Sequence, residues 1–259
     1  ISRVSSGSKM DQIYIPKNRS GFNIGSYVII KQFGKKMIIE KPYFYNIDYV
    51  EPMKLEIINE IIKIIEKNCN SKNIIFTGSF LNKGFNFNDI DILLISENKI
   101  NIEHFKKVIE NNTGIKAHIL LLSNNELING LSTDPLYQMM LSKCIAKKRF
   151  IYNVKKNIDY KLLDLHLLKS KTLLDNFDIL NGSEKYYMTR NLISIYLYVN
   201  ERKISKKIVD TEIKKVFGLN INNIQNNMID NKFLIKYKEV YNKTFNRIMR
   251  SIKNDTKQK

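Results

Sequence analysis

The stretch TGSFLNKGFNFNDIDILLI, residues 77–95, decides the predicted fold. The apolar run Asn73 to Thr77 predicts a short strand that ends at Gly78-Ser79, where a short helix begins, and Asp89 to Ile95 predicts a second strand. Glycine lets the backbone come close to a ligand. Exposed N–H groups at a helix start favour anions such as triphosphate oxygens, and the Ser79 hydroxyl adds one more donor.

Two carboxylates share one face of the second predicted strand. Asp89 and Asp91 stand two residues apart, so the period of two puts both on one face and Ile90 and Ile92 on the other. Mg²⁺ prefers carboxylates together with phosphate oxygens and water. The pattern predicts Mg²⁺ or Mn²⁺ bound by Asp89 and Asp91 beside a phosphate-binding turn, which suits nucleotidyl transfer. The alternative is a solvated strand face near a turn.

The chain around this segment alternates between helix and strand. Pro52 opens a helix at its first turn, where a missing N–H costs little, and apolar residues recur at helical spacing from Leu55 to Ile65. A second helix is predicted at Ile102 to Asn111 and a third strand at Ile115 to Leu122. This order is typical of an α/β (α+β) fold with a small mixed sheet.

The central segment resembles the signature of the DNA polymerase beta nucleotidyltransferase superfamily. That signature is an apolar residue, Gly, Gly or Ser, about nine to thirteen residues, and then Asp-apolar-Asp-apolar. Here nine residues separate Gly78-Ser79 from Asp89-Ile90-Asp91-Ile92. The resemblance covers Pro52 to Tyr152, and Lys148 to Tyr152 resembles the short strand that often ends this domain. It implies that Gly78 and Ser79 hold a nucleoside triphosphate and that Asp89 and Asp91 bind catalytic Mg²⁺.

The same resemblance implies a third carboxylate on the third strand, which helps to activate an acceptor hydroxyl. The in-register residue is His118, which is suited to general-base work because imidazole titrates near neutral pH, although Mg²⁺ prefers oxygen ligands. The alternative is a structural His118 in a catalytically weakened copy. Glu126 and Asp134 are further candidates for the missing acid, and spacing selects neither.

Minimal nucleotidyltransferases tend to carry Arg in the turn after Gly-Ser, whereas this chain has Asn82-Lys83-Gly84. Lys83 is therefore a candidate phosphate ligand that lacks the bidentate fork of Arg, or else an ordinary surface lysine.

The region from Asp159 to Lys259 predicts a basic helical domain. Helices are expected around Leu162 to Leu173, at Tyr186 to Val199, from an N-cap at Ser205 to Phe217-Gly218, and near Phe233 to Ile252. From residue 201 onward, 15 Lys and Arg stand against 6 Asp and Glu. Half of the excess positive charge of the chain therefore lies in its last 59 residues.

Several residues outside the central segment are weaker candidates for binding. Arg190 reaches the nucleotide if its helix flanks the cleft, and the neighbouring tyrosines at 186 and 187 are either core or a stacking platform for bases. His104 is interpreted as solvated and His166 as a core or boundary residue. Four basic residues of the last helix either track a phosphate backbone or form a plain solvated face: Lys236, Lys243, Arg247 and Arg250.

The first fifty residues predict short strands punctuated by glycine, at Gln12 to Pro16, Ser26 to Lys31 and Lys36 to Glu40. Lys17 to Phe22 is a basic loop that either contacts phosphate or forms a surface turn. Met10 is expected to be the natural start, so residues 1–9 carry no weight in the predicted fold.

The composition favours polyanionic partners. The chain carries 43 Lys and Arg against 25 Asp and Glu, a net charge of +18, for which a bias toward Ile, Asn and Lys codons is the alternative cause. No apolar run approaches the ~20 residues of a membrane span, and the polar start predicts no secretory signal. Cys69 and Cys144 make neither a disulfide framework nor a zinc site, which favours the reducing cytoplasm.

These observations predict three regions: a tail with a small β segment at 1–50, a nucleotidyltransferase domain at 51–155 and a basic helical domain at 156–259. The predicted activity moves a nucleoside monophosphate from a nucleoside triphosphate to an acceptor hydroxyl. RNA, especially tRNA, is the first expected acceptor, followed by protein hydroxyls, as in antitoxin members of the family, and then by small molecules. The rival prediction is a degenerate copy that binds RNA or a partner protein, including an antitoxin.

Overall fold

The computed structural model describes residues 4–5, 7–10, 12–13, 42–152 and 154–257, and the chain divides into compact units at 1–39 and 40–259. In the first unit, β1 (Val4–Ser5) pairs antiparallel with β2 (Gln12–Ile13). The strand predicted from Gln12 is confirmed over these two residues. The strands predicted at 26–31 and 36–40 and the basic loop at 17–22 lie outside the described residues.

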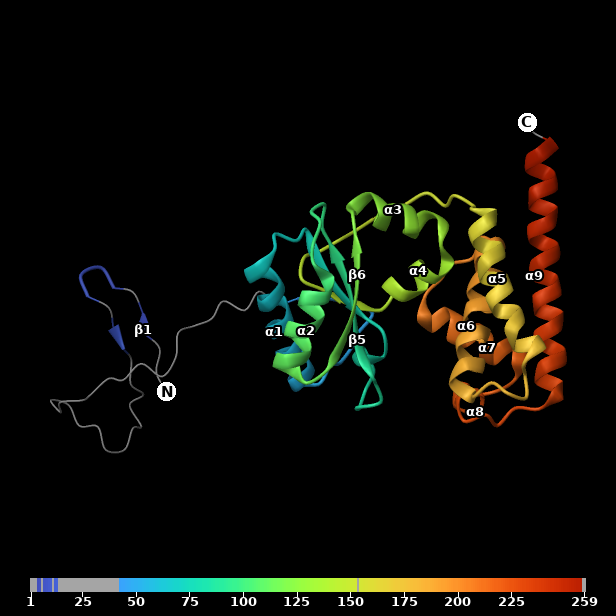
Figure 1. The fold of residues 1–259 in the computed structure, drawn as a ribbon, viewed down its shortest axis with the longest axis horizontal. Helices are drawn as coiled ribbons and strands as arrows, with labels where there is room; N and C mark the ends of the chain where they lie inside the picture. Colours follow the sequence, from blue (N-terminus) through green and yellow to red (C-terminus); the bar gives the residue numbers. More distant parts are fainter. Residues whose placement is uncertain (1–3, 6, 11, 14–41, 153, 258–259) are drawn as a thin grey trace. The chain divides into compact units, whose positions relative to one another are not determined.

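The second unit contains a five-stranded mixed sheet (Figure 1). The strand order is β3-β7-β4-β5-β6, and each neighbouring pair is antiparallel except β5–β6, which is parallel. A largely helical region follows the sheet, so the predicted α/β class is confirmed. The strands are β3 (Tyr43–Tyr45), β4 (Asn73–Thr77), β5 (Asp89–Ile95), β6 (Lys116–Leu122) and β7 (Cys144–Ala146).

Helices cover both faces of this sheet (Figure 1). On β4, Ile74 and Phe76 enter a hydrophobic cluster with α1 and α2, whereas Ile75 enters a second cluster with residues of α3 and α4. The alternation follows from the period of two along a strand. The four helices are α1 (Pro52–Asn68), α2 (Ile102–Thr113), α3 (Asn124–Thr133) and α4 (Pro135–Leu141).

The alternation on β5 and β6 decides where the polar side chains go. On β5, Leu93 and Ile95 belong to the α3–α4 cluster, so Asp89 and Asp91 project from the same face as those two residues. On β6, Ala117 and Ile119 enter the opposite cluster, which leaves His118 on the face of the aspartates.

The helical region is built from five helices around its own core (Figure 1). Its centre includes the fully buried Tyr237, and Met139 of α4 joins the same cluster, so α4 packs against the helical core. The helices are α5 (Tyr160–Asp175), α6 (Gly182–Val199), α7 (Lys206–Phe217), α8 (Ile221–Gln225) and α9 (Asn231–Lys257). The predicted cap at Ser205 is confirmed, since its side chain accepts from the N–H of Ile208.

The strand predicted at Lys148 to Tyr152 is wrong, and β7 takes its place at Cys144–Ala146. The reason is that a side chain replaces the expected strand partner of Phe150. The Tyr45 hydroxyl donates to the Phe150 carbonyl oxygen at 2.9 Å and accepts from the Phe150 N–H at 2.8 Å. The two rings also stack with centroids 4.5 Å apart.

The N-terminal strand predictions also missed β3, which is an edge strand of the sheet and pairs with β7. Throughout the described chain, every helix is too short or too polar to traverse a lipid bilayer.

Candidate functional site

The predicted turn after β4 lies directly against a carboxylate. Gly78 has φ +83° and ψ −159°, a conformation that is essentially restricted to glycine. A Cβ added at this position would lie 2.0 Å from Oδ2 of Asp91, so the turn approaches the carboxylate as closely as a glycine allows. The 3-10 helix η1 (Ser79–Leu81) follows. It is one short turn, so single backbone N–H groups matter here and a helix dipole contributes little.

Asp91 also contacts the histidine predicted to replace the third acid. In the parallel β5–β6 pair, Asp91 is in register with His118, as expected from the sequence. The His118 Nδ1 lies 3.2 Å from Asp91 Oδ1. The structure therefore brings Gly78, Asp91 and His118 together, with Asp89 two residues away on the same strand face.

Burial makes the Asp91 carboxyl harder to ionise. Loss of solvent raises its pKa, and the hydrogen bond from His118 opposes that rise while the charge of Asp89 adds to it. A cation between the two carboxylates would offset both the loss of solvent around Asp91 and its repulsion from Asp89. Among the described residues, no three Asp, Glu, His or Cys side chains are arranged to hold a metal ion. Two protein carboxylates still fit Mg²⁺, which usually keeps several waters and takes its other ligands from substrate phosphates.

The other candidates for a third acid have structural roles. Glu126 completes a capping box with Ser123 at the start of α3. Asp134 caps α4 through the N–H of Leu136 and lies 3.1 Å from Nε2 of His166. His166 is buried as expected, and its Nδ1 has no hydrogen-bond partner in the described part of the chain.

A buried lysine that the sequence argument missed holds the turn after η1. Lys54 of α1 is 2% exposed, and its Nζ donates to the carbonyl oxygens of Asn82 and Gly84, each at 2.6 Å. Glu51 pairs with Lys54 and accepts from the N–H of Gly84 at 2.8 Å. The hydrogen bond from Gly84 is the main reason why the pKa of Glu51 falls to about 2.

A signal for Lys54 was present in the sequence. It precedes Ile58 by four residues, so it lies on the buried stripe of α1 that Ile58, Ile61 and Ile65 continue. A lysine on such a stripe requires internal partners, because an unpaired buried charge is costly.

A second missed cluster lies where α7 meets the end of the sheet. The side-chain oxygen of Asn82 accepts from Nζ of Lys143 at 2.9 Å and from Nζ of Lys206 at 3.2 Å. The Lys206 N–H donates to the Ser142 hydroxyl at 2.9 Å, which joins the start of α7 to the loop before β7. These residues line a cavity of about 710 Å³.

Arg190 lies near this second cluster. Its positive charge acts on the ionisation of Lys206 and Asp210, and its guanidinium lies over the rings of Tyr186 and Tyr187. Its Nε is buried without a hydrogen-bond partner among the described residues. The two tyrosines are thus occupied by a cation in this structure.

The remaining predicted residues lie on the surface. Lys83 and His104 are exposed, and the His104 side chain is solvated as expected. Four basic residues of α9 are also exposed, and their spacings of seven, four and three place them on one stripe of the helix: Lys236, Lys243, Arg247 and Arg250.

Comparisons of the chain with models of protein families, with curated proteins and with solved structures found no match. The chemistry of the site therefore rests on its own residues.

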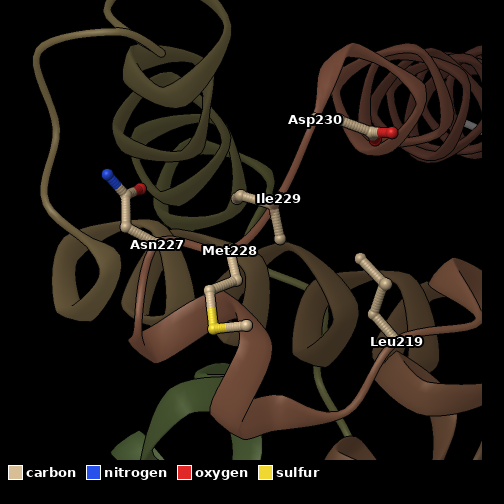
Figure 2. Close-up of a pocket in the computed structure, with 5 residues that line it drawn as sticks. All are labelled: Leu219, Asn227, Met228, Ile229 and Asp230. Atoms are coloured by element: carbon tan, nitrogen blue, oxygen red, sulfur yellow. The ribbon is translucent and has the colours of Figure 1, made fainter.

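A further hollow of about 370 Å³ lies in the helical region before α9 (Figure 2). None of the predicted site residues lines it. Its single acid, Asp230, accepts from the N–H groups of Lys232 and Phe233 and so caps α9. The other lining residues are Leu219, Asn227, Met228 and Ile229. The hollow offers no group arranged for catalysis.

Proposed function

We propose that this protein is a Mg²⁺-dependent nucleotidyltransferase of the DNA polymerase beta type. The observation that carries the proposal is the contact between the Gly78 turn and the Asp91 carboxylate. A phosphate bound at the turn and a cation bound at Asp89 and Asp91 would be direct neighbours. This arrangement supports the resemblance of residues 77–95 to the family signature.

Asp89 and Asp91 would hold the divalent ion, Mg²⁺ or Mn²⁺. When bound, the ion supplies charge neutralisation for the phosphate oxygens. With two protein ligands, its affinity is expected to depend on the nucleotide that completes the coordination. The backbone at Gly78, the Ser79 hydroxyl and Lys83 would hold the nucleoside triphosphate. The Ser79 hydroxyl has no hydrogen-bond partner among the described residues and is therefore available as a donor.

The transfer step would use His118 as the general base. If Nδ1 donates its hydrogen to Asp91, Nε2 keeps a lone pair and accepts the proton of the acceptor hydroxyl. The hydroxyl oxygen forms a bond to the α-phosphorus, the bond from the α-phosphorus to the bridging oxygen breaks, and pyrophosphate leaves. Catalysis rests on positioning and electrostatics, without a covalent protein intermediate.

The expected acceptor is RNA, with tRNA first. Support comes from the net charge of +18 and from the exposed basic stripe of α9. Protein hydroxyls are the second choice.

The test is a transfer assay with Mg²⁺ and labelled nucleoside triphosphates, with the protein alone and with total RNA. Asp89→Asn and Asp91→Asn should each abolish label transfer. Asp164→Asn, the same chemical change at an exposed site on α5, should leave it unchanged. A second readout is Mn²⁺ binding, which should tighten when a non-hydrolysable triphosphate is present. Transfer that survives both Asp89→Asn and Asp91→Asn contradicts the proposal.

A second candidate function is a catalytically inactive binding protein, which is favoured by His118 at the position where the family carries an acid. It predicts RNA or protein binding without label transfer, and binding that does not change in Asp89→Asn or Asp91→Asn.

A further inference from the structure

Two lysines meet at one neutral acceptor beside the candidate site. The Nζ atoms of Lys143 and Lys206 lie 2.9 Å and 3.2 Å from the same Asn82 oxygen, so they are at most 6.1 Å apart. An amide oxygen carries no charge to offset two ammonium groups. Lost solvent and repulsion from neighbouring lysines lower the pKa of both, and this favours an anion as the missing partner.

The cavity around these lysines carries an excess of positive charge. Lys207, the residue after Lys206, lines it as well, and so does Lys214, about two turns further along α7. The acids that line it are Asp48 and Asp210. The Asp210 carboxylate accepts from the Tyr186 hydroxyl at 2.9 Å. Four lysines against two aspartates leave two positive charges among the lining residues. A terminal phosphate carries close to two negative charges at neutral pH, whereas a phosphodiester carries one.

The cavity lies on the opposite side of the Gly78 turn from the aspartates. Ser142 and Lys143 precede β7, and Asn46 follows β3, whereas Asp89, Asp91 and His118 belong to β5 and β6. In the sheet order, β4 and its turn separate these two groups. The lysine cavity is therefore an electrostatic feature separate from the aspartate pair.

We propose that the cavity between Asn82, Lys143 and the start of α7 binds a terminal phosphate group. Lys143 and Lys206 are its main ligands, and the amide of Asn82 holds the two ammonium groups in position. The bound phosphate accepts hydrogen bonds from the two ammonium groups in place of Asn82 or together with it. Its two negative charges balance the two excess positive charges of the lining residues. The site needs no metal ion and does not depend on the proposed transfer reaction.

The test measures binding of pyrophosphate by isothermal titration calorimetry in EDTA, so that the aspartate pair cannot contribute through a metal ion. Wild-type protein should bind pyrophosphate saturably, and added salt should weaken the binding. Lys143→Gln and Lys206→Gln should each weaken it at least tenfold. Lys238→Gln, the same change at an exposed site on α9, should leave it unchanged. Thermal unfolding of each variant checks that the fold is retained.

Further titrations identify the source of the phosphate. ATP and a short RNA with a 5′-phosphate are compared with adenosine and with the same RNA carrying a 5′-hydroxyl. Competition by ATP alone assigns the cavity to the nucleotide, and competition by the 5′-phosphorylated RNA assigns it to the acceptor. Absence of saturable pyrophosphate binding, or equal binding by wild type and the Lys143→Gln/Lys206→Gln double variant, overturns the proposal. If the wild type binds pyrophosphate but transfers no label, the result counts against the transferase proposal alone.

Discussion

Two aspartate–histidine pairs occur in this molecule at nearly the same distance and in opposite surroundings. Asp91 and His118 lie 3.2 Å apart at the end of the sheet, with 34% and 69% of their side chains exposed. Asp134 and His166 lie 3.1 Å apart between α4 and α5, with 12% and 10% exposed. The second pair also caps a helix, whereas the first contacts the glycine turn.

The difference teaches that distance alone does not identify a catalytic pair. In the Asp134–His166 pair, the Asp134 oxygen that faces the histidine already accepts a hydrogen bond from the N–H of Leu136. The other imidazole nitrogen, Nδ1, is buried. In Asp91–His118 the imidazole is open to solvent, so a ligand can reach it. We expect the exposed pair to control activity and the buried pair to control stability.

The largest expected effect is on activity in Asp91→Asn. We predict that kcat/KM for nucleotidyl transfer falls by at least about 10³-fold, because losing a charged metal ligand costs several kcal/mol in the transition state. Steady-state kinetics with labelled nucleotide measure this effect. Asp134→Asn should change the rate per folded molecule less than about threefold. Similar losses in both variants would break the contrast between the pairs.

The next effect is that of His118→Gln, which should lower kcat by about 10²-fold, the lower end of what a general base contributes. Steady-state kinetics of both proteins at pH 7 measure this. Full activity in His118→Gln would remove His118 from the reaction and leave Asp91 as the essential member of its pair.

For the buried pair, we predict that His166→Leu lowers the free energy of unfolding by about 1–3 kcal/mol, because Asp134 then loses a buried hydrogen-bond partner. Urea denaturation monitored by circular dichroism gives the value. His118→Gln is the matched control and should shift stability by less than about 0.5 kcal/mol, since its side chain is mostly exposed. Equal losses would mean that both pairs are structural.

The smallest effect concerns the stability of Asp91→Asn as a function of pH. The folded pKa of Asp91 is raised, so ionisation of this residue works against folding above that pKa. Asp91→Asn should therefore be more stable than wild type at pH 7, by about 0.5–1 kcal/mol. The advantage should shrink as the pH falls through the raised pKa and vanish below the ordinary value of 3.8. Denaturation at a series of pH values tests this, and an advantage that grows on acidification would contradict it.

The sheet around the exposed pair was predictable from local patterns. Residues Asp89 to Ile95 combine alternation with β-branched and apolar side chains, so both the strand and the shared face of its acids follow from the period of two. The parallel register with His118 also agreed with the sequence argument. Helix starts were clear where a cap or proline marked them, as at Pro52 and Ser205.

The rest of the site depends on contacts between distant segments. Residues 144–146 form a strand too short to show a period, while the aromatic run that follows has a stronger intrinsic preference for β structure and misled the prediction. Lys143, Asn82 and Lys206 converge across as many as 124 positions in the chain. Sequence spacing does not predict these contacts, because they form only when α7 packs against the end of the sheet.

The buried ammonium of Lys54 has a consequence for how a ligand is received. It ties the first turn of α1 to the carbonyl groups at 82 and 84, and Glu51 completes the tie through the amide of Gly84. The loop that leaves the glycine bend is thus preorganised before any ligand arrives, which reduces the conformational entropy lost on association. The side chains of Lys143 and Lys206, which contact Asn82 in this loop, have long flexible stems that can adjust to different ligands.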